Sequence, residues 1–416
     1  MLPHLQSALG IWAIILAAWA LSEDRRAFPW RTVAVGVALQ IALALLLLKV
    51  PPARATLLSL NGVVDALMAA TKAGTAFVFG YPGGAKPPFA VTNPAGLSSF
   101  AFQVLPLVIV ISALAALLWH WRVLPIVVGG FAWVLRKTLK LGGAVGLGAA
   151  ATIFLGMIEA PLLIRPYLAK LTRSELFTLF TVGLSTVAGT VFVLYATILR
   201  TAIPGALGHI LVASVLSLFS AIVISRIMIP GERQTARDEA AGFEFRSSMD
   251  AIARGTEDGL KLWLSIVAML LVIVALVALA DILLGHLPGV FGAPLTVERI
   301  FGWIFSPFVW LLGIPWHEAR VAGSLMGDKT VLNEFIAYLH LAALPPGTLD
   351  PRARLIMVYA LCGFANLGSV GIMIASISGM APERRHDIVP LALRALVSGT
   401  LASSMTGAVI GLLPVT

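Results

Sequence analysis

Long apolar stretches separated by short polar loops recur along the whole chain of 416 residues. Several of these stretches approach the ~20 residues that a helix needs to cross a bilayer. They cover residues 5–21, 33–50, 100–119, 176–199, 207–229, 262–284, 300–314, 355–374 and 388–413. The pattern predicts an all-α integral membrane protein with about eight transmembrane helices.

Composition supports this prediction, since 59% of the residues are hydrophobic and only 12% are charged, far fewer charged residues than in a soluble domain. The net charge of +9 is spread over short loops, so we expect a lipid bilayer and no nucleic acid as partner. Arg25, Arg26 and Arg31 cluster between the first two stretches, whereas the residues before the first stretch include no Lys or Arg. The positive-inside bias therefore predicts a cytoplasmic first loop and an N-terminus on the outer side of the membrane.

Two acidic residues, Glu159 and Glu334, lie in largely apolar surroundings that are rich in small residues. A carboxylate at membrane depth is costly, so it tends to face a water-filled cavity or a bundle interior and to have a function. One such residue in each half of a polytopic chain predicts a binding site for a polar solute.

Each of these glutamates belongs to a segment that interrupts the pattern of spans. Residues 142–161 contain five glycines, and residues 315–334 carry several charges, so neither segment suits a lipid-facing helix. Irregular backbone is tolerated at membrane depth only where protein or a cavity surrounds it, which favours two buried re-entrant hairpins. Residues 61–70 are interpreted as a short amphipathic helix at the interface.

Residues 183–191 can be laid over residues 363–371, a register that aligns Thr186 with Asn366. Helices rich in Gly and Ala also resemble one another by chance, but both stretches follow an acidic interrupted segment, a basic loop and an apolar run. This order favours an inverted repeat with broken helices, as in secondary transporters. We accordingly divide the chain into N-terminal spans (1–99), a first hairpin and gate repeat (100–200), scaffold spans with a surface loop (201–299), and a second hairpin, broken helix and last span (300–416).

The sequence offers little support for an enzyme. His317-Glu318 begins like a zinc-binding helix, but position 321 is Val and the second histidine is absent. Residues 327–330 lack the ending of a phosphate-binding loop, so we expect no nucleotide hydrolysis and no cofactor beyond a coupling ion. Glu334 is able to accept hydrogen bonds from sugar-like hydroxyls, and Asn366 offers a donor and an acceptor.

The segment Gly327-x-Lys329-x-x-x-Asn333-Glu334-Phe335-x-Ala337 resembles the signature of the concentrative nucleoside transporters, and the N-terminal spans fit the bacterial form of that family. Further segments similar to the family are Phe102-Gln-Val-Leu-Pro106, Glu159-Ala-Pro-Leu-Leu-Ile-Arg-Pro166, Leu171-Thr-Arg-Ser-Glu-Leu176, Ala360-Leu-Cys-Gly-Phe-Ala-Asn366 and Ala381-Pro-Glu-Arg-Arg385.

The resemblance implies a homotrimer of eight-span protomers, each with two opposed re-entrant hairpins and the substrate between the hairpin tips and two broken helices. It implies that Na⁺ is held by the side chains of Thr152 and Thr186 and the carbonyls of Leu155 and Val187. The substrate-binding residues that it implies are Met157, Ile158, Glu159, Val191, Asn333, Glu334, Phe364, Asn366 and Ser369. Among these, Glu334, Asn366 and Ser369 would face the ribose.

The chain departs from the family at the first hairpin tip, where Gly156-Met157-Ile158-Glu159 replaces the usual Gly-Gln-Thr-Glu. The family's Gln and Thr read the nucleobase, so two polar readers are apolar here. This predicts a preference for something other than ordinary uridine: a purine or modified nucleoside, or another ribosyl-like solute. Thr152 replaces an Asn of the family's sodium site, which leaves both Na⁺ and H⁺ as coupling ions.

Together these observations predict an ion-coupled symporter, driven by Na⁺ or H⁺, that imports nucleosides across the bacterial cytoplasmic (inner) membrane. Two alternatives remain open: a passive channel or facilitator, and a transporter of the same fold for a modified nucleoside or other ribosyl-like solute.

Overall fold

The computed structural model describes residues 3–92, 97, 99–231, 245–290 and 292–414. All regular secondary structure within these residues is helical, and the β-pairing there is limited to one isolated bridge between Val290 and Ala293. The predicted all-α class is confirmed.

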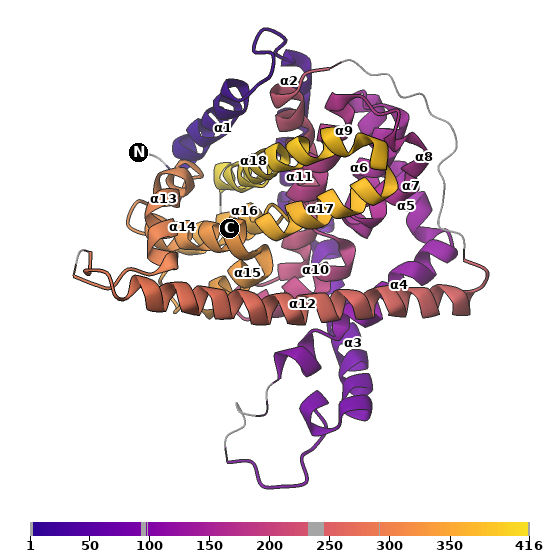
Figure 1. Cartoon of the computed structure of the whole chain (residues 1–416), viewed down its shortest axis with the longest axis vertical. Helices are drawn as coiled ribbons and strands as arrows, with labels where there is room; N and C mark the ends of the chain where they lie inside the picture. The colour runs from indigo at the N-terminus through magenta and orange to yellow at the C-terminus, as the bar shows by residue number, and fades with distance from the viewer. Residues whose placement is uncertain (1–2, 93–96, 98, 232–244, 291, 415–416) are drawn as a thin grey trace.

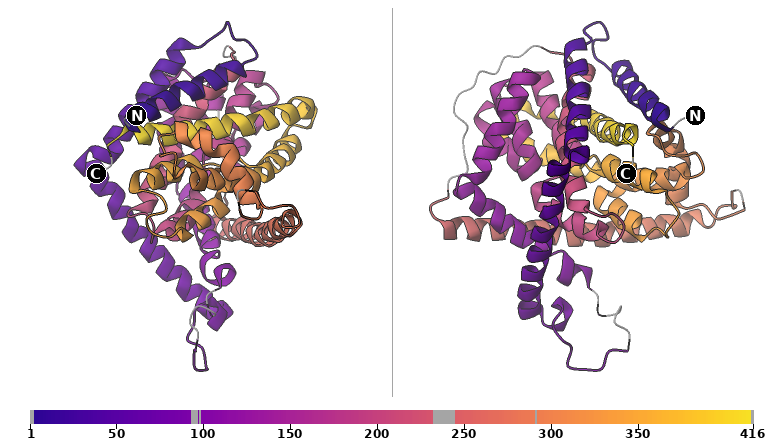
Figure 2. Two further views of the ribbon diagram at one scale, coloured as in Figure 1. Left: turned by 90° about the vertical axis from the view of Figure 1, so that its left-hand side faces the viewer. Right: turned by 180° about the vertical axis from the view of Figure 1, so that it is seen from behind.

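The N-terminal part of the chain forms three helices that flank the body of the protein. They are α1 (Pro3–Ala20), α2 (Trp30–Lys49) and α3 (Pro51–Phe79), followed by the short turns η1 (Tyr81–Gly83) and η3 (Phe100–Val104). The side-chain amide of Gln40 in α2 donates to the carbonyl of Leu216 and the hydroxyl of Thr406, which attaches α2 to the body. Figures 1 and 2 show α3 projecting away from the body.

The short interfacial helix predicted for residues 61–70 is part of the much longer α3, which has 29 residues. Prolines 51 and 52 start a new helix directly after α2, because proline suits the first helical turn. No break follows until Gly80, whose φ of 64° ends the helix. By length and hydropathy, α3 is among the helices able to cross a membrane.

After η3 the same order of elements occurs twice: two helices, a helical hairpin, a broken helix and an unbroken helix. The first series is α4 (Leu107–His120), α5 (Val123–Thr138), α6 (Gly143–Leu155), α7 (Glu159–Leu163), α8 (Arg165–Leu168), α9 (Arg173–Ser185), α10 (Gly189–Leu199) and α11 (Ala206–Met228). The second series is α12 (Ser248–Leu284), α13 (Val297–Leu311), α14 (Ala319–Gly327), η4 (Asp328–Leu332), α15 (Glu334–Ala343), α16 (Pro351–Leu361), α17 (Leu367–Met380), η5 (Pro382–Arg384) and α18 (Arg385–Leu412). This order agrees with the repeat read from the sequence.

The number of segments able to cross a membrane is consistent with a protein that spans it several times. Seven helical stretches of the described residues are long and apolar enough, and α9 with α10 counts as one of them. The helix α1 is apolar but shorter, and the broken pair α16 and α17 is divided by residues 362–366.

The first predicted hairpin, residues 142–161, is present as α6, a turn at residues 156–158, and α7 with α8. Its glycines allow close packing inside the protein: a Cβ on Gly148 would lie 2.9 Å from Ile164 Cδ1 and 3.0 Å from Leu179 Cδ1. Nearly all of α6 is buried. The Gly-rich composition is therefore explained by burial in protein, as the sequence indicated.

The second hairpin is displaced from its predicted position. Residues 315–318 form a turn after α13, and the hairpin itself runs from Ala319 to Ala343 with its tip at Asn333. The reason is local, since the Asn333 side chain caps a new helix that begins at Glu334. Glu334 is thus the first residue of the returning arm, and Glu159 holds the same place in the first hairpin.

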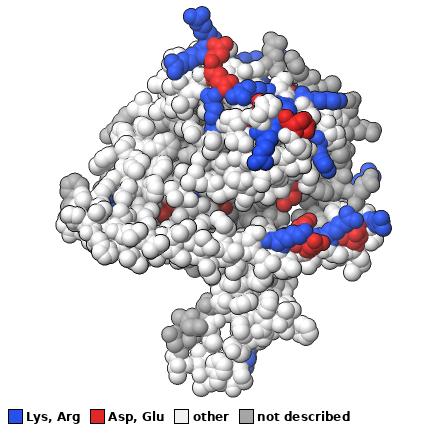
Figure 3. Space-filling model, in the orientation of Figure 1, with Lys and Arg blue, Asp and Glu red and all other residues white. Residues whose placement is uncertain are grey.

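Charge is distributed unevenly over the surface. In Figure 3 the charged side chains gather at the upper end of the molecule and at one end of α12, while broad areas between them are uncharged. The charged end of α12 carries the ion pairs Arg254–Asp250 and Lys261–Glu257, each spaced four residues apart. After Lys261, α12 is apolar except for Ser265 and Asp281, and it lies across the body in Figure 1. None of its most apolar 18 residues is buried.

Candidate functional site

The two broken helices meet at their breaks. The α9 helix ends at Ser185 and α10 begins at Gly189, while α16 ends at Leu361 and α17 begins at Leu367. The backbone N–H of Phe364 donates to the carbonyl of Thr186 at 3.3 Å. A Cβ on Gly363 would lie 2.8 Å from the Ser185 carbonyl oxygen, so only glycine permits this approach. Backbone groups released from both helices therefore lie together inside the protein.

Glu334 lies beside this crossing, at the first position of α15, with 4% of its surface exposed. The Tyr195 hydroxyl of α10 donates to Glu334 Oε1 at 2.5 Å. The Asn366 side-chain amide at the start of α17 donates to Glu334 Oε2 at 3.1 Å. One buried carboxylate thus joins the second hairpin to a half-helix of each broken helix.

Asn366 is held in a defined orientation by its own helix. Its Oδ1 accepts the backbone N–H of Ser369 at 2.7 Å as the N-cap of α17, which leaves Nδ2 to point at Glu334. Asn333 has an equivalent role at the second tip, where its Oδ1 accepts the N–H of Ile336 at 2.9 Å. The structure therefore brings Glu334, Asn366 and Ser369 together, and Asn333 directly precedes Glu334 at the hairpin tip.

The tip of the first hairpin packs against the break between α9 and α10. Gly156 at this tip has φ of +98°, and a Cβ there would lie 2.8 Å from Ala188 Cβ and 3.3 Å from Glu159 Oε2. A Cβ on Gly189 would lie 2.7 Å from the Phe154 carbonyl oxygen. Both hairpin tips therefore approach the broken helices, from which we expected the binding site to be built.

Met157 lies deep in the first tip. A Cβ added to Gly183 would lie 3.0 Å from Met157 Cβ and 3.2 Å from Met373 Cε. Met157 of the hairpin and Met373 of α17 therefore both pack against Gly183. Met157 is buried, whereas Ile158 beside it is half-buried. Val191, in the first turn of α10, is also buried, and Phe364 at the other break is half-buried.

The residues expected at a sodium site occupy the first tip and the first break. The Thr152 hydroxyl in the last turn of α6 donates to the Gly148 carbonyl at 2.8 Å, and the Thr186 hydroxyl donates to the Val182 carbonyl at 2.9 Å. The Val187 carbonyl accepts the hydroxyl of Ser214 at 3.3 Å. Each donating hydroxyl oxygen keeps lone pairs for a cation. Leu155 is the last residue of α6, beside the turn.

Two polar residues of this region were missed by the sequence interpretation. Tyr195 was passed over within an apolar run, although a buried tyrosine hydroxyl usually requires a hydrogen-bond partner. Lys329 belongs to the recognised signature but received no role. Its ammonium is fully buried and donates to the Ala360 carbonyl at 2.7 Å and to Ser403 Oγ at 2.6 Å, which ties the second hairpin to α16 and α18.

Comparison with known proteins identifies the fold. Residues 209–411 match the family described as "Na+ dependent nucleoside transporter C-terminus", residues 9–82 match its N-terminus, and residues 101–202 match a "Nucleoside recognition" gate. The uncharacterized transporter YutK of Bacillus subtilis is 39% identical over 97% of this chain and 98% of its own length. The chain belongs to the concentrative nucleoside transporter family. Another member, the nucleoside permease NupC of Helicobacter pylori, is 34% identical over 98% of this chain and 97% of its own.

Solved structures of the family agree with the fold described above. The structure entitled "CNTnw in an inward-facing substrate-bound state" superimposes with a TM-score of 0.89 at 34% identity, over 99% of this chain and 98% of that one. These relatives are transporters, so the expectation that the chain is not an enzyme is confirmed. The predicted family is confirmed as well.

Proposed function

We propose that this concentrative nucleoside transporter is an ion-coupled symporter that imports nucleosides, or a near relative of a nucleoside. It would lie in the bacterial cytoplasmic membrane with the N-terminus of the chain in the periplasm. The observation that carries the proposal is the buried Glu334 carboxylate, held by Tyr195 and Asn366 where two broken helices cross. A buried carboxylate with oriented neutral donors is suited to accept hydrogen bonds from the hydroxyls of a sugar.

On this proposal the ribose lies against Glu334, Asn366 and Ser369. A carboxylate has about four lone-pair positions, so Glu334 is able to accept two sugar hydroxyls while it keeps Tyr195 and Asn366. Phe364 and Val191 supply apolar surface at the two breaks. Glu334, Asn366 and Ser369 are each less than 8% exposed, so a hairpin has to move before a substrate reaches them.

The nucleobase is proposed to face the first tip, where Met157, Ile158 and Glu159 lie. Two apolar side chains cannot satisfy the polar edge of uracil, and an unpaired buried group costs roughly 1–3 kcal/mol. They are able to pack against a larger ring face. The substrate is therefore proposed to be a purine or modified nucleoside, or another ribosyl-like solute, in preference to uridine.

For the coupling ion we propose a site between Thr152 and Thr186, completed by the carbonyls of Leu155 and Val187. Broken helices in transporters commonly bind Na⁺ through such released carbonyls. A proton is the alternative ion, because a threonine replaces the amide ligand that the family usually has. The assembly is proposed to be a homotrimer, which would cover part of the exposed apolar surface of α12.

The test is uptake into proteoliposomes that contain the purified protein. Radiolabelled adenosine, inosine and uridine are supplied under an imposed Na⁺ gradient, an imposed pH gradient, or neither. The proposal expects accumulation above the external concentration under one of the two gradients, and loss of that accumulation when the matching ionophore is added. Uptake that only equilibrates under every gradient would instead identify a passive facilitator.

A further inference from the structure

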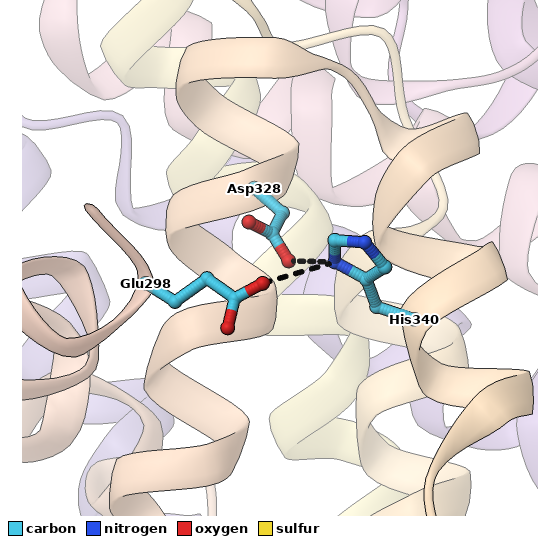
Figure 4. Close-up of side chains that lie close together, drawn as sticks. All are labelled: Glu298, Asp328 and His340. Atoms are coloured by element: carbon cyan, nitrogen blue, oxygen red, sulfur yellow. Dashed lines mark hydrogen bonds and ion pairs between the residues drawn. The ribbon is translucent and has the colours of Figure 1, made fainter. Parts of the chain in front are cut away.

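Three side chains of types that ligate metals meet between α13 and the second hairpin, outside the proposed substrate site (Figure 4). Glu298 comes from the first turn of α13, Asp328 from the first position of η4, and His340 from α15. His340 Nδ1 lies 2.7 Å from Asp328 Oδ2 and 3.9 Å from Glu298 Oε1. One ligand atom from each residue lies within 4.8 Å of the other two.

Asp328 is a buried carboxylate whose ion-pair partner is a histidine. Its side chain is 5% exposed, and within the described residues no lysine or arginine forms an ion pair with it. The neighbouring Lys329 directs its ammonium away, to Ala360 and Ser403. Burying a carboxylate is costly unless a cation or a set of donors compensates its charge. Here the compensating partner is an imidazole, which is itself a good metal ligand.

The donor set of one imidazole nitrogen and two carboxylate oxygens matches the ligands that Zn²⁺ takes in proteins, where three side chains often leave the fourth position to water. Mg²⁺ and Ca²⁺ prefer oxygen ligands alone. Ligand atoms on one tetrahedral zinc lie about 3.3 Å apart for bonds of about 2.0 Å. The 2.7 Å separation of His340 and Asp328 must therefore widen slightly, and the 3.9 Å separation to Glu298 must close. Glu298 and His340 are 55% and 43% exposed, so both have room to move.

We propose that Glu298, Asp328 and His340 form a binding site for Zn²⁺ or a similar divalent transition metal. The site would cross-link both arms of the second hairpin and α13. Asp328 precedes the tip residue Asn333 by five positions, and His340 follows Glu334 by six on the same helix. A bound metal therefore restrains the hairpin that carries Glu334, and we expect it to slow uptake. This effect on uptake rests on the proposed function, whereas metal binding does not.

Binding is measured by isothermal titration of Zn²⁺ into the full-length protein in detergent, after removal of any affinity tag. The expected result is one saturable site per chain, with the affinity for Zn²⁺ lowered at least tenfold in Glu298→Gln and in His340→Gln. Mg²⁺ should not compete. His386→Gln is the matched control, because His386 also lies beside one carboxylate, 3.6 Å from Asp387, but is 76% exposed. Among the residues that the structure describes, it belongs to no such cluster. Its affinity for Zn²⁺ should stay within twofold of the wild type.

Since Glu298 is largely exposed, Glu298→Gln should fold normally, which an unchanged melting temperature without metal would verify. Absence of a saturable Zn²⁺ site, an equal loss in His386→Gln, or competition by Mg²⁺ would overturn the proposed site. In proteoliposomes, Zn²⁺ should slow uptake by the wild type and have no effect on His340→Gln. If Zn²⁺ binds as expected but uptake is unaffected, the proposal that the metal restrains the hairpin is wrong. If the wild type shows no uptake even without Zn²⁺, only the proposed function is contradicted.

Discussion

The hydrogen bond from Tyr195 to Glu334 offers a sharp test of the proposed site, through the substitution Tyr195→Phe. The change deletes one hydroxyl and leaves the ring, which packs 5.1 Å from the ring of Tyr338. The lost bond is short, at 2.5 Å, and is made to a buried carboxylate. Hydrogen bonds to charged groups contribute about 1.5–3 kcal/mol. If Tyr195 orients Glu334 for the substrate, affinity should fall about 10- to 100-fold, since each 1.4 kcal/mol corresponds to about tenfold.

Tyr338→Phe is the matched control, because Tyr338 is also buried and its hydroxyl donates to the Val358 carbonyl at 2.8 Å rather than to Glu334. Both variants should lose some thermal stability, since each loses a buried hydrogen bond. Only Tyr195→Phe should weaken the binding of the preferred nucleoside, measured by titration calorimetry on purified protein. Equal affinities in the two variants, or tighter binding in Tyr195→Phe, would refute the role given to Tyr195.

Three further outcomes are expected. Glu334→Gln should reduce uptake at least about 100-fold while the protein stays folded, because two or more hydrogen bonds to a charge are weakened. Uptake into vesicles at equal protein level measures this effect. A wild-type uptake rate would exclude Glu334 from the site. The double substitution Met157→Gln with Ile158→Thr should raise the affinity for uridine about tenfold relative to the native ligand, as measured with both ligands on both proteins. Thr152→Ala should raise the Na⁺ concentration for half-maximal uptake about tenfold, whereas Thr178→Ala, which removes a similar buried hydroxyl from α9, should not. If uptake by the wild type depends on a pH gradient and is independent of Na⁺, the proposed sodium site is wrong.

Much of the fold follows from pattern and composition. Apolar length predicts the spans, and the small residues of the first hairpin predict burial against protein. The order of hairpin, broken helix and unbroken helix was also visible, because turn and breaker residues mark it. The sequence predicted the second hairpin less well, since the charges of residues 315–318 suggested that it begins earlier. Those residues form the turn before the hairpin, and Asn333 sets the true tip by capping α15.

The register between the two breaks shows a similar limit. Thr186 and Asn366 were aligned, and both lie at a break. Thr186 closes α9, however, whereas Asn366 opens α17. A weak sequence match places the breaks without showing which half-helix each residue caps, because caps depend on local backbone geometry. Tyr195 was missed for a different reason: its partner Glu334 is 139 positions away in the chain, and spacing gives no sign of such a contact.

The two hairpins place a glutamate at the same position but surround it differently. Glu334 receives hydrogen bonds from two side chains on two other helices, so its carboxylate is fixed before any substrate binds. Glu159 is half-buried at the first tip, where its Oε2 would lie 3.3 Å from a Cβ on Gly156. A fixed carboxylate loses little freedom when it binds a sugar, whereas a partly exposed carboxylate at a hairpin tip has more freedom to lose. On the proposed function, the second of these two acidic tips anchors the sugar, and the first adapts to the part of the solute that varies.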